Sequence, residues 1–256
     1  MLTTSVTGMK QQQGFSLIST LIGLLISMIV ILGMLAIYRT SVQVSVRATE
    51  DASQSNQKIS GLLRADKHLQ SAGFGLAEPE YGGTNIHLIA NGSLSGGVSG
   101  TLSGTAETPS GSPRQASGNA IVWYREDDAN LNGVIENSEK ICEGLLARVS
   151  GNEFAGLLRL LPEDNCTGAD TWGTIDWTAT VLVSAPSLSA HPAMVFQVTE
   201  AEDSTESCRP FGIGDAAAPE NSASGGLVVT LSTQVSTQDS VVSSTTCLAN
   251  FVFPAA

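Results

Sequence analysis

An uncharged apolar run near the N-terminus constrains this chain more than any other feature. The run extends for 24 residues, from Phe15 to Tyr38, without a charged side chain. A helix of that length is roughly 36 Å long, whereas the hydrocarbon core of a bilayer is about 30 Å thick. The run is too long for the apolar part of an ordinary cleaved signal, and no small-x-small cleavage site follows it. We therefore expect one membrane-spanning helix over residues 15–38.

The hydrophobic pattern changes after this span. Apolar residues now recur at helical spacing among polar ones, at Ile59, Leu62, Leu63, Leu69 and Ala72. This spacing predicts an amphipathic helix that continues the first one as a stem over residues 39–75. We expect it to end at Gly73 and Gly75, because glycine is common just past the C-terminus of a helix.

The positive charges that flank the span leave its orientation open. Lys10 and the terminal amine precede it, whereas Arg39, Arg47 and Lys58 follow it. Since Lys and Arg favour the cytoplasmic side of a membrane, charge alone does not place the C-terminal region outside the cell. A more specific signal is needed.

That signal lies at Gly14 and Phe15, where a short polar leader (residues 1–14) meets the apolar run. The stretch KQQQGFSLISTLIGLL, which begins at Lys10, resembles the signal of type IV prepilins. In that family a dedicated peptidase cuts after the glycine, and the new N-terminal phenylalanine is methylated. The cut removes the leader and keeps the membrane helix, so the resemblance implies an exported C-terminal region.

A second match lies at the end of the stem. The stretch LLRADKHLQSAGFGL, from Leu62 to Leu76, resembles the corresponding segment of PilW-type minor pilins. The matching residues are Asp66, Ala72, Gly73, Phe74 and Gly75, whereas His68 and Gln70 replace the residues usual there. The two matches cover residues 10–76, and matching context gives such motifs their weight.

The resemblance implies a minor pilin subunit involved in type IV pilus assembly. Its expected partners are other major and minor pilins, the prepilin peptidase and the inner-membrane assembly platform. Before assembly it would cross the inner membrane once with a periplasmic head, and afterwards it would lie in the pilus at the cell surface. A pseudopilin of a type II secretion system and a calcium-dependent pilus-associated adhesin are the alternatives. An ordinary signal-anchored protein with a chance Gly-Phe junction is a third.

One residue departs from the family pattern. Family members usually carry glutamate as the fifth residue after the cut, and this chain has Ser19. A carboxylate within a bilayer is costly unless it is paired, so its usual presence implies a pairing partner in the fibre. We interpret Ser19 as favouring a subunit that primes or caps the pilus tip, with neutral drift as the alternative.

The C-terminal region, residues 76–256, reads as a β-rich head. Residues 91–118 are rich in Gly, Ser, Thr and Pro and predict a disordered loop, and a second such stretch covers residues 200–225. The strand-like runs are Asn119–Arg125, Phe154–Leu161, Ile175–Val183, Met194–Val198, Leu227–Val235 and Leu248–Phe253. We therefore predict an α+β fold in which the long N-terminal helix packs on an antiparallel sheet, as in pilins.

Four cysteines lie in the head, at Cys142, Cys166, Cys208 and Cys247. Their wide spacing excludes a C-x-x-C zinc or redox motif, and their position beyond a membrane span favours disulfides. Of the three possible connectivities we favour pairing of sequence neighbours, Cys142 with Cys166 and Cys208 with Cys247, because each bridge would then brace one loop region. Four buried thiols are the alternative.

The sharpest local motif fits a twelve-residue calcium loop, D-x-[DN]-x-[DN]-G-x5-E. The ligands it predicts are Asp128, Asn130, Asn132, Val134 through its carbonyl, Glu136 and Glu139. Such a loop supplies the hard oxygens that Ca²⁺ prefers, and Gly133 permits its sharp turn. With two asparagines the affinity should be weak, on the order of 10⁻⁴ M. A polar turn without metal is the alternative.

Other functions find little support in the sequence. The formal net charge of −12 opposes binding to the phosphate backbone of nucleic acids. None of the H-E-x-x-H, G-x-S-x-G or G-x-x-x-x-G-K-[ST] motifs occurs, and the three histidines, His68, His87 and His191, are scattered. We therefore do not expect an enzyme.

Overall fold

The fold is that of a computed structural model, in which two compact units are described separately. The units are residues 1–49 and residues 50–256. The residues that the structure describes are 16–77, 79–128, 131, 133–136, 139–150, 153–163, 166–185, 193–201, 226–234, 241–248, 250, 251 and 253.

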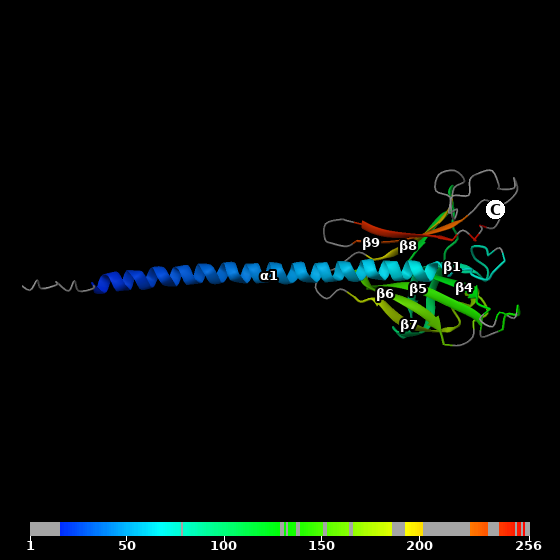
Figure 1. The fold of residues 1–256 in the computed structure, drawn as a ribbon, viewed down its shortest axis with the longest axis horizontal. Helices are drawn as coiled ribbons and strands as arrows, with labels where there is room; N and C mark the ends of the chain where they lie inside the picture. Colours follow the sequence, from blue (N-terminus) through cyan, green and yellow to red (C-terminus); the bar gives the residue numbers. More distant parts are fainter. Residues whose placement is uncertain are drawn as a thin grey trace, which may run out of the picture. The chain divides into compact units, whose positions relative to one another are not determined.

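The longest element is the helix α1, Leu17–Leu69, which contains 53 residues (Figure 1). Residues 16–49 of the first unit are all exposed. In the described part of the chain, α1 is the one helix whose length and apolar composition suit a membrane crossing. The helix ends at Leu69 and not at residue 75 as predicted, and residues 70–75 form turns.

The second unit is built of antiparallel strands in two sheets. The strands are β1 (Ile86–Leu94), β2 (Ser99–Ala106), β3 (Gln115–Gly118), β4 (Ala120–Glu126), β5 (Lys140–Ser150), β6 (Glu153–Pro162), β7 (Asp176–Val183), β8 (Val195–Glu200), β9 (Leu227–Gln234) and β10 (Val241–Leu248), with a short 3-10 helix, η2 (Ala169–Thr171). Six strands close a barrel in the order β1-β2-β7-β6-β5-β4, and the others form a sheet in the order β10-β9-β8-β3. The α+β class is therefore confirmed, but two sheets replace the single sheet expected.

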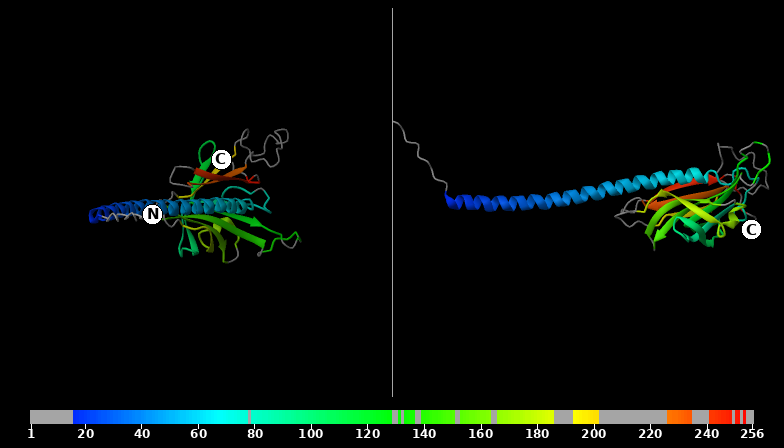
Figure 2. Two further views of the ribbon diagram at one scale, coloured as in Figure 1. Left: turned by 60° about the vertical axis from the view of Figure 1, so that its left-hand side comes forward. Right: turned by 90° about the horizontal axis from the view of Figure 1, so that it is seen from below.

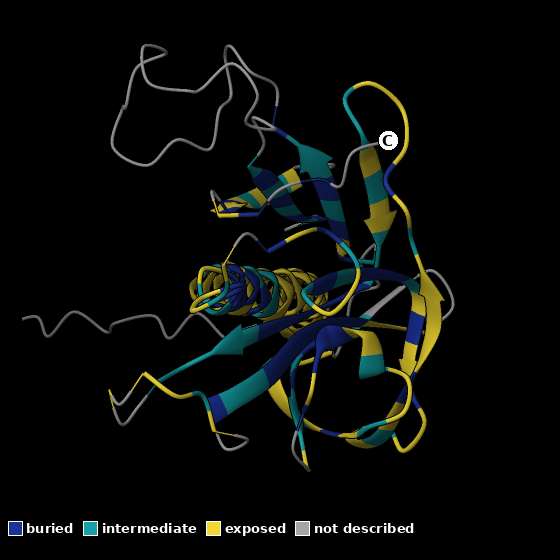
Figure 3. Ribbon diagram, turned by 90° about the vertical axis from the view of Figure 1, so that its right-hand side faces the viewer, coloured by how far each residue is buried: buried dark blue, intermediate teal, exposed yellow. Residues whose placement is uncertain are grey.

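Within this unit the last part of α1 lies between the barrel and the four-stranded sheet (Figures 2 and 3). Strand β4 shows how the sequence divides the core. Val122 and Tyr124 belong to the cluster inside the barrel, whereas Ile121 and Trp123 belong to the cluster between the barrel, α1 and the other sheet. Side chains alternate between the faces of a strand, so one strand serves two cores.

The prediction of a disordered loop over residues 91–118 is wrong, because much of this segment forms strands. The segment contains the end of β1, all of β2 and all of β3. Only Leu94 and Leu102 of the β1–β2 hairpin are buried apolar residues there, and the outward positions carry serine, threonine and glycine. The pattern of apolar alternation was therefore too sparse to mark strands that are held by backbone pairing.

The other differences concern single strands. Strand β5 was not predicted, although it is buried over residues 142–147. Of the expected strand Leu248–Phe253, Leu248 is the last residue of β10, and the described residues 250, 251 and 253 lie outside any strand. The remaining five expected strands correspond to β4, β6, β7, β8 and β9.

Candidate functional site

The site is the junction where the stem of α1 enters the head. The buried residues of α1 are Gln54, Lys58, Gly61, Leu62, Ala65 and Leu69. They recur every three or four residues and so form one face of the helix. This face belongs to the second unit and packs into the cluster between the barrel and the four-stranded sheet.

At Gly61 the backbone of the stem packs closely against the barrel. A Cβ atom at this position would lie 2.0 Å from Cγ2 of Val183 on β7. The side-chain amide of Gln54 also donates a hydrogen bond to the carbonyl oxygen of Ser184, at 3.3 Å, just past the end of β7. The glycine therefore lets the helix backbone pack directly against β7.

Lys58 is fully buried on the same face, with 0% of its surface exposed. Burial disfavours the ammonium form and lowers the pKa of Lys58 to about 8. A buried charge of this kind destabilises the fold at neutral pH unless its partners compensate. The sequence did not identify Lys58 as a site residue, because a single lysine among polar residues of the stem gives no sign that its side chain is buried.

The residues that match the minor-pilin stretch make specific contacts. Asp66 Oδ1 accepts a hydrogen bond from Thr246 Oγ1 on β10. The backbone N–H of Gly73 donates to the carbonyl oxygen of Tyr124 at 3.1 Å, and Asn250 Nδ2 donates to the carbonyl oxygen of Gly73 at 3.0 Å. Ala72 is buried in the same core. The motif therefore joins the helix end to β4 and β10.

Gly75 and Phe74 extend this junction to the end of β4. The N–H of Glu126 donates to the carbonyl oxygen of Phe74 at 2.9 Å. Gly75 has a φ of +79°, and a Cβ there would lie 2.3 Å from the carbonyl oxygen of Glu126. Glycine is therefore required at residue 75 both for the backbone conformation and for the close approach. The Phe74 side chain itself is exposed.

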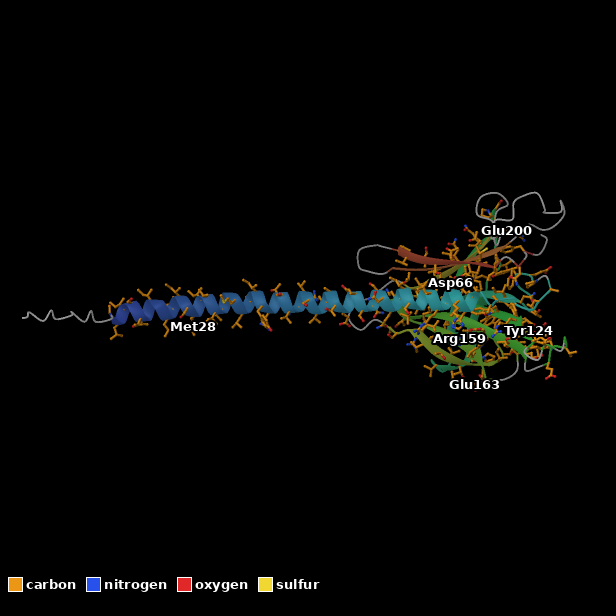
Figure 4. All side chains as sticks on the ribbon, viewed as in Figure 1. Met28, Asp66, Tyr124, Arg159, Glu163 and Glu200 are labelled. Atoms are coloured by element: carbon orange, nitrogen blue, oxygen red, sulfur yellow. A yellow bond between two sulfur atoms is a disulfide. The ribbon has the colours of Figure 1, made fainter. Side chains whose placement is uncertain are left out.

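A charged cluster braces the stem against the outer face of the barrel. Glu143 on β5 is only 1% exposed. Its carboxylate pairs with Arg159 Nε on β6 and with His68 Nδ1 on α1, the latter at 2.9 Å, and Arg125 Nε lies 4.0 Å away. Burial of a carboxylate is tolerated only with such partners. Figure 4 shows Asp66 and Arg159 on opposite sides of the end of α1.

His68 is the member of this cluster whose side chain normally changes charge near neutral pH. Burial lowers its pKa, Glu143 raises it, and the positive charges of Arg159, Lys67 and Arg125 lower it further, so that the net direction is downward. His68 is therefore mainly neutral at pH 7 and donates from Nδ1 to the carboxylate. In the sequence His68 is one of three scattered histidines with no recognisable role, because its partners Glu143 and Arg159 are distant along the chain.

The predicted calcium loop follows directly after β4. Asp128, Val134, Glu136 and Glu139 are described, whereas Asn130 and Asn132 lie outside the described residues. Gly133 has a φ of +74°, and its N–H donates to Asp128 Oδ2 at 2.8 Å. The first and sixth loop positions are thus joined.

The end of the loop is joined in the same way. The N–H of Glu136 donates to Glu139 Oε2 at 2.9 Å, and Glu139 is buried. At the base of the loop, the N–H of Asp127 donates to the carbonyl oxygen of Glu139 at 3.0 Å. Among the residues that the structure describes, no three His, Cys, Asp or Glu side chains are gathered as they would be around a metal.

One of the two predicted disulfides is confirmed. Cys142 on β5 is bonded to Cys166, with Cα atoms 5.6 Å apart, and both are buried inside the barrel. Cys247 on β10 is also disulfide-bonded, and Cys208, its predicted partner, lies outside the described residues. The predicted processing residues, Gly14 and Phe15, lie outside them too.

Comparison of the chain with protein-family models, with curated proteins and with solved structures finds no match. The functional argument therefore rests on the residues and their contacts.

Proposed function

We propose that this chain is a membrane-anchored minor subunit of a type IV pilus that takes part in pilus assembly. The observation that carries the proposal is the junction at the end of α1. The residues that resemble the minor-pilin stretch, including Asp66, Gly73 and Gly75, are those that tie the helix to β4 and β10. A chance match to the motif would not be expected to fall on the contacts that hold the stem.

The helix itself supports the same proposal. α1 continues without a break from an exposed apolar segment into a stem that packs in the head. A subunit of this kind could be anchored in a membrane before assembly and could pack its apolar segment against other subunits afterwards. The partners would be major and minor pilins, the prepilin peptidase and the assembly platform of the inner membrane.

Processing of the N-terminus tests this proposal. Mass spectrometry of the full chain from its native membrane should show a mature form that begins at Phe15 and carries one N-terminal methyl group. Replacement of Gly14 by glutamate should leave the leader in place and prevent incorporation into pili. An intact Met1 on the native protein would contradict the proposal.

The proposal includes a calcium ion in the loop after β4. Asp128, Glu136 and Glu139 would supply carboxylate oxygens and Val134 its carbonyl, with Asn130 and Asn132 completing the set. The described part of the loop fits this role, because its first and sixth positions and its ninth and twelfth positions already lie close together. Calcium there would brace the base of the loop between β4 and β5.

Calcium binding is tested by thermal unfolding of the full chain in detergent. With a dissociation constant on the order of 10⁻⁴ M, 1 mM Ca²⁺ should stabilise the head by about 1.4 kcal/mol. The Asp128→Asn variant should lose most of this gain, while Asp176→Asn, an exposed control at the start of β7, should keep it. An equal response to Mg²⁺, or no response to either ion, would exclude a calcium loop.

The position of the subunit in the fibre follows from Ser19. This residue lies on α1 at the place where the family usually has glutamate, and a subunit without that carboxylate need not dock beneath another. We therefore place the subunit at or near the pilus tip. Immunogold labelling should mark fibre ends, and labels spread along the shaft would contradict this placement.

A further inference from the structure

The last turn of α1 carries a histidine that contacts the barrel and is still reached by solvent. His68 lies between Ala65 and Leu69 in the sequence, and both of these residues are buried in the core that holds the stem. The side chain of His68 is 26% exposed. Since the ordinary pKa of histidine is about 6.5, mild acid is enough to add a proton to such a side chain.

The contact with Glu143 determines which ring nitrogen takes up that proton. Nδ1 of His68 lies 2.9 Å from the Glu143 carboxylate, which can only accept hydrogen bonds when it is ionised. In the neutral ring Nδ1 therefore carries the hydrogen and Nε2 carries the lone pair. A proton from solvent adds at Nε2, while the hydrogen bond from Nδ1 to Glu143 can persist. Acid therefore changes the charge of this contact and not its hydrogen-bond partner.

The charged groups near this imidazole come from every element packed around it. β5 contributes the carboxylate of Glu143, β6 the guanidinium of Arg159, and β4 that of Arg125. On α1 itself, Lys67 is the adjacent residue, and Arg64 precedes the histidine by one turn. Positive groups therefore outnumber the one carboxylate that contacts the imidazole.

Two further carboxylates lie nearby but do not offset this excess. Asp127 pairs with Arg125 at 3.4 Å, and its side chain is 50% exposed, so solvent screens its charge. Asp66 accepts a hydrogen bond from Thr246 on β10. It therefore faces the other sheet, and Figure 4 shows it across the end of α1 from Arg159. Residues two apart on a helix do not face each other, so Asp66 is not a partner for His68.

A proton on His68 consequently destabilises the junction between the stem and the barrel. The buried Glu143 carboxylate is already paired with Arg159, and a protonated imidazole brings another positive charge to the same place. Burial and the positive charges of Arg159, Lys67 and Arg125 outweigh the attraction of Glu143, so the pKa of His68 is lowered. The unfolded chain then binds this proton more readily than the folded junction. The contribution of His68 to stability is therefore complete above about pH 6.5 and is lost as the pH falls below that value.

We propose that His68 makes the attachment of the stem to the barrel sensitive to mild acid. A proton on its imidazole loosens the end of α1 from β5 and β6. The turn that follows loosens with it, because the N–H of Gly73 donates to the carbonyl oxygen of Tyr124 on β4 just beyond this contact. This inference goes beyond the pilus assignment and does not rest on it.

Hydrogen exchange of the full chain in detergent tests this proposal between about pH 7 and pH 5. Each exchange rate is divided into the rate of an unstructured chain at the same pH, which gives the protection of that amide. The amides of Leu69 and Gly73 at the junction should lose protection toward pH 5, whereas those of β9 in the other sheet should keep theirs. Equal loss in β9, unchanged protection at the junction, or a gain of protection there would overturn the proposal.

Histidine variants assign the effect to one residue. In His68→Gln the side-chain amide can still donate to Glu143 but takes up no proton, so the junction should keep its protection at pH 5. His68→Lys carries a permanent charge at this place and should show the reduced protection already at pH 7.

The matched control is His87→Gln, which changes a histidine of β1 whose Nε2 lies 2.7 Å from the carbonyl oxygen of Gly83. This variant should lose protection at the junction as the parent protein does. A His68→Gln protein that loses protection as the parent does, or a His87→Gln protein that keeps it, would show that His68 is not the group responsible.

Discussion

Replacement of Gly61 by alanine tests whether the stem packs on the barrel as closely as the structure indicates. The new Cβ would lie 2.0 Å from Cγ2 of Val183, whereas carbon atoms in contact are about 3.5 Å or more apart. The helix or β7 must therefore move by about 1.5 Å. Such overpacking lowers the free energy of unfolding by about 1–3 kcal/mol, whereas the higher helix propensity of alanine raises it by about 0.5–1 kcal/mol. We expect a net loss of about 1–2 kcal/mol.

Urea unfolding of the full chain in detergent, followed by tryptophan fluorescence, measures this loss. The three tryptophans, Trp123, Trp172 and Trp177, all lie in the head and so report on its unfolding. The midpoint should fall in Gly61→Ala. The additional change Val183→Ala removes the clashing methyl group, and the double variant should show a favourable interaction energy of about 1 kcal/mol or more.

A matched control lies on the same helix. Gly33 has no atom within 4 Å of the position that its Cβ would occupy, so Gly33→Ala should leave the midpoint of the head unchanged. A Gly61→Ala protein that is as stable as the parent, or more stable, would refute the close approach of α1 to β7. Equal effects of the two glycine substitutions would refute it as well.

Three further predictions concern buried groups. Burial lowers the pKa of Lys58 from 10.5 to about 8, so the unfolded chain binds more protons than the folded chain between these two pH values. The free energy of unfolding should therefore rise by about 2 kcal/mol from pH 7 to pH 10, relative to the Lys58→Met variant. Glu143→Gln should destabilise the head by about 2 kcal/mol in urea unfolding, because Arg159 loses its charged partner, discounted for the partial exposure of that arginine. Removal of the Cys142–Cys166 bridge by two alanines should cost about 3 kcal/mol in thermal unfolding.

Each of these predictions has its own control. The Lys58→Met protein should show no rise in stability over that pH range beyond the background of the other groups, and a parallel rise in both proteins would contradict the assigned cause. The control Glu163→Gln changes an exposed residue of the barrel and should alter the free energy of unfolding by less than about 0.5 kcal/mol. If Glu143→Gln has an equally small effect, the role assigned to Glu143 is contradicted. Dithiothreitol also reduces the disulfide of Cys247, so it should lower the stability of the parent protein by about 3 kcal/mol more than that of the alanine pair, and equal losses in the two proteins would contradict the assigned role of the Cys142–Cys166 bridge.

The sequence was most informative where a single physical requirement dominates. A run of 24 uncharged residues can satisfy its backbone in a membrane only as a helix, and α1 indeed begins at Leu17 and continues through this run. Five strands with clear apolar alternation were located, and so was the Cys142–Cys166 bridge. The glycines at residues 73 and 75 marked the end of the stem, although the helix itself stops at Leu69.

The sequence was least informative where polar residues form regular structure. The β1–β2 hairpin is held by backbone pairing between serine-, threonine- and glycine-rich strands, and composition alone favours a loop for such a stretch. The sequence also does not show that six strands close into a barrel, because closure depends on which strands pair with one another and not on the pattern within any one strand. The calcium loop stays a prediction, because Asn130 and Asn132 lie outside the described residues and the hydrogen bonds of Asp128 and Glu139 do not by themselves show a metal site.

By itself the sequence determined the order of the parts along the chain: an apolar helical segment, an amphipathic stem and a β-rich head that contains the four cysteines. Local periodicity and composition carry that information. The tertiary structure alone decided the contacts among them. Glu143, Arg159 and His68 form one cluster around the buried Glu143 carboxylate only because β5, β6 and α1 converge there. The cluster depends on distances between residues far apart in the chain, which no local pattern encodes.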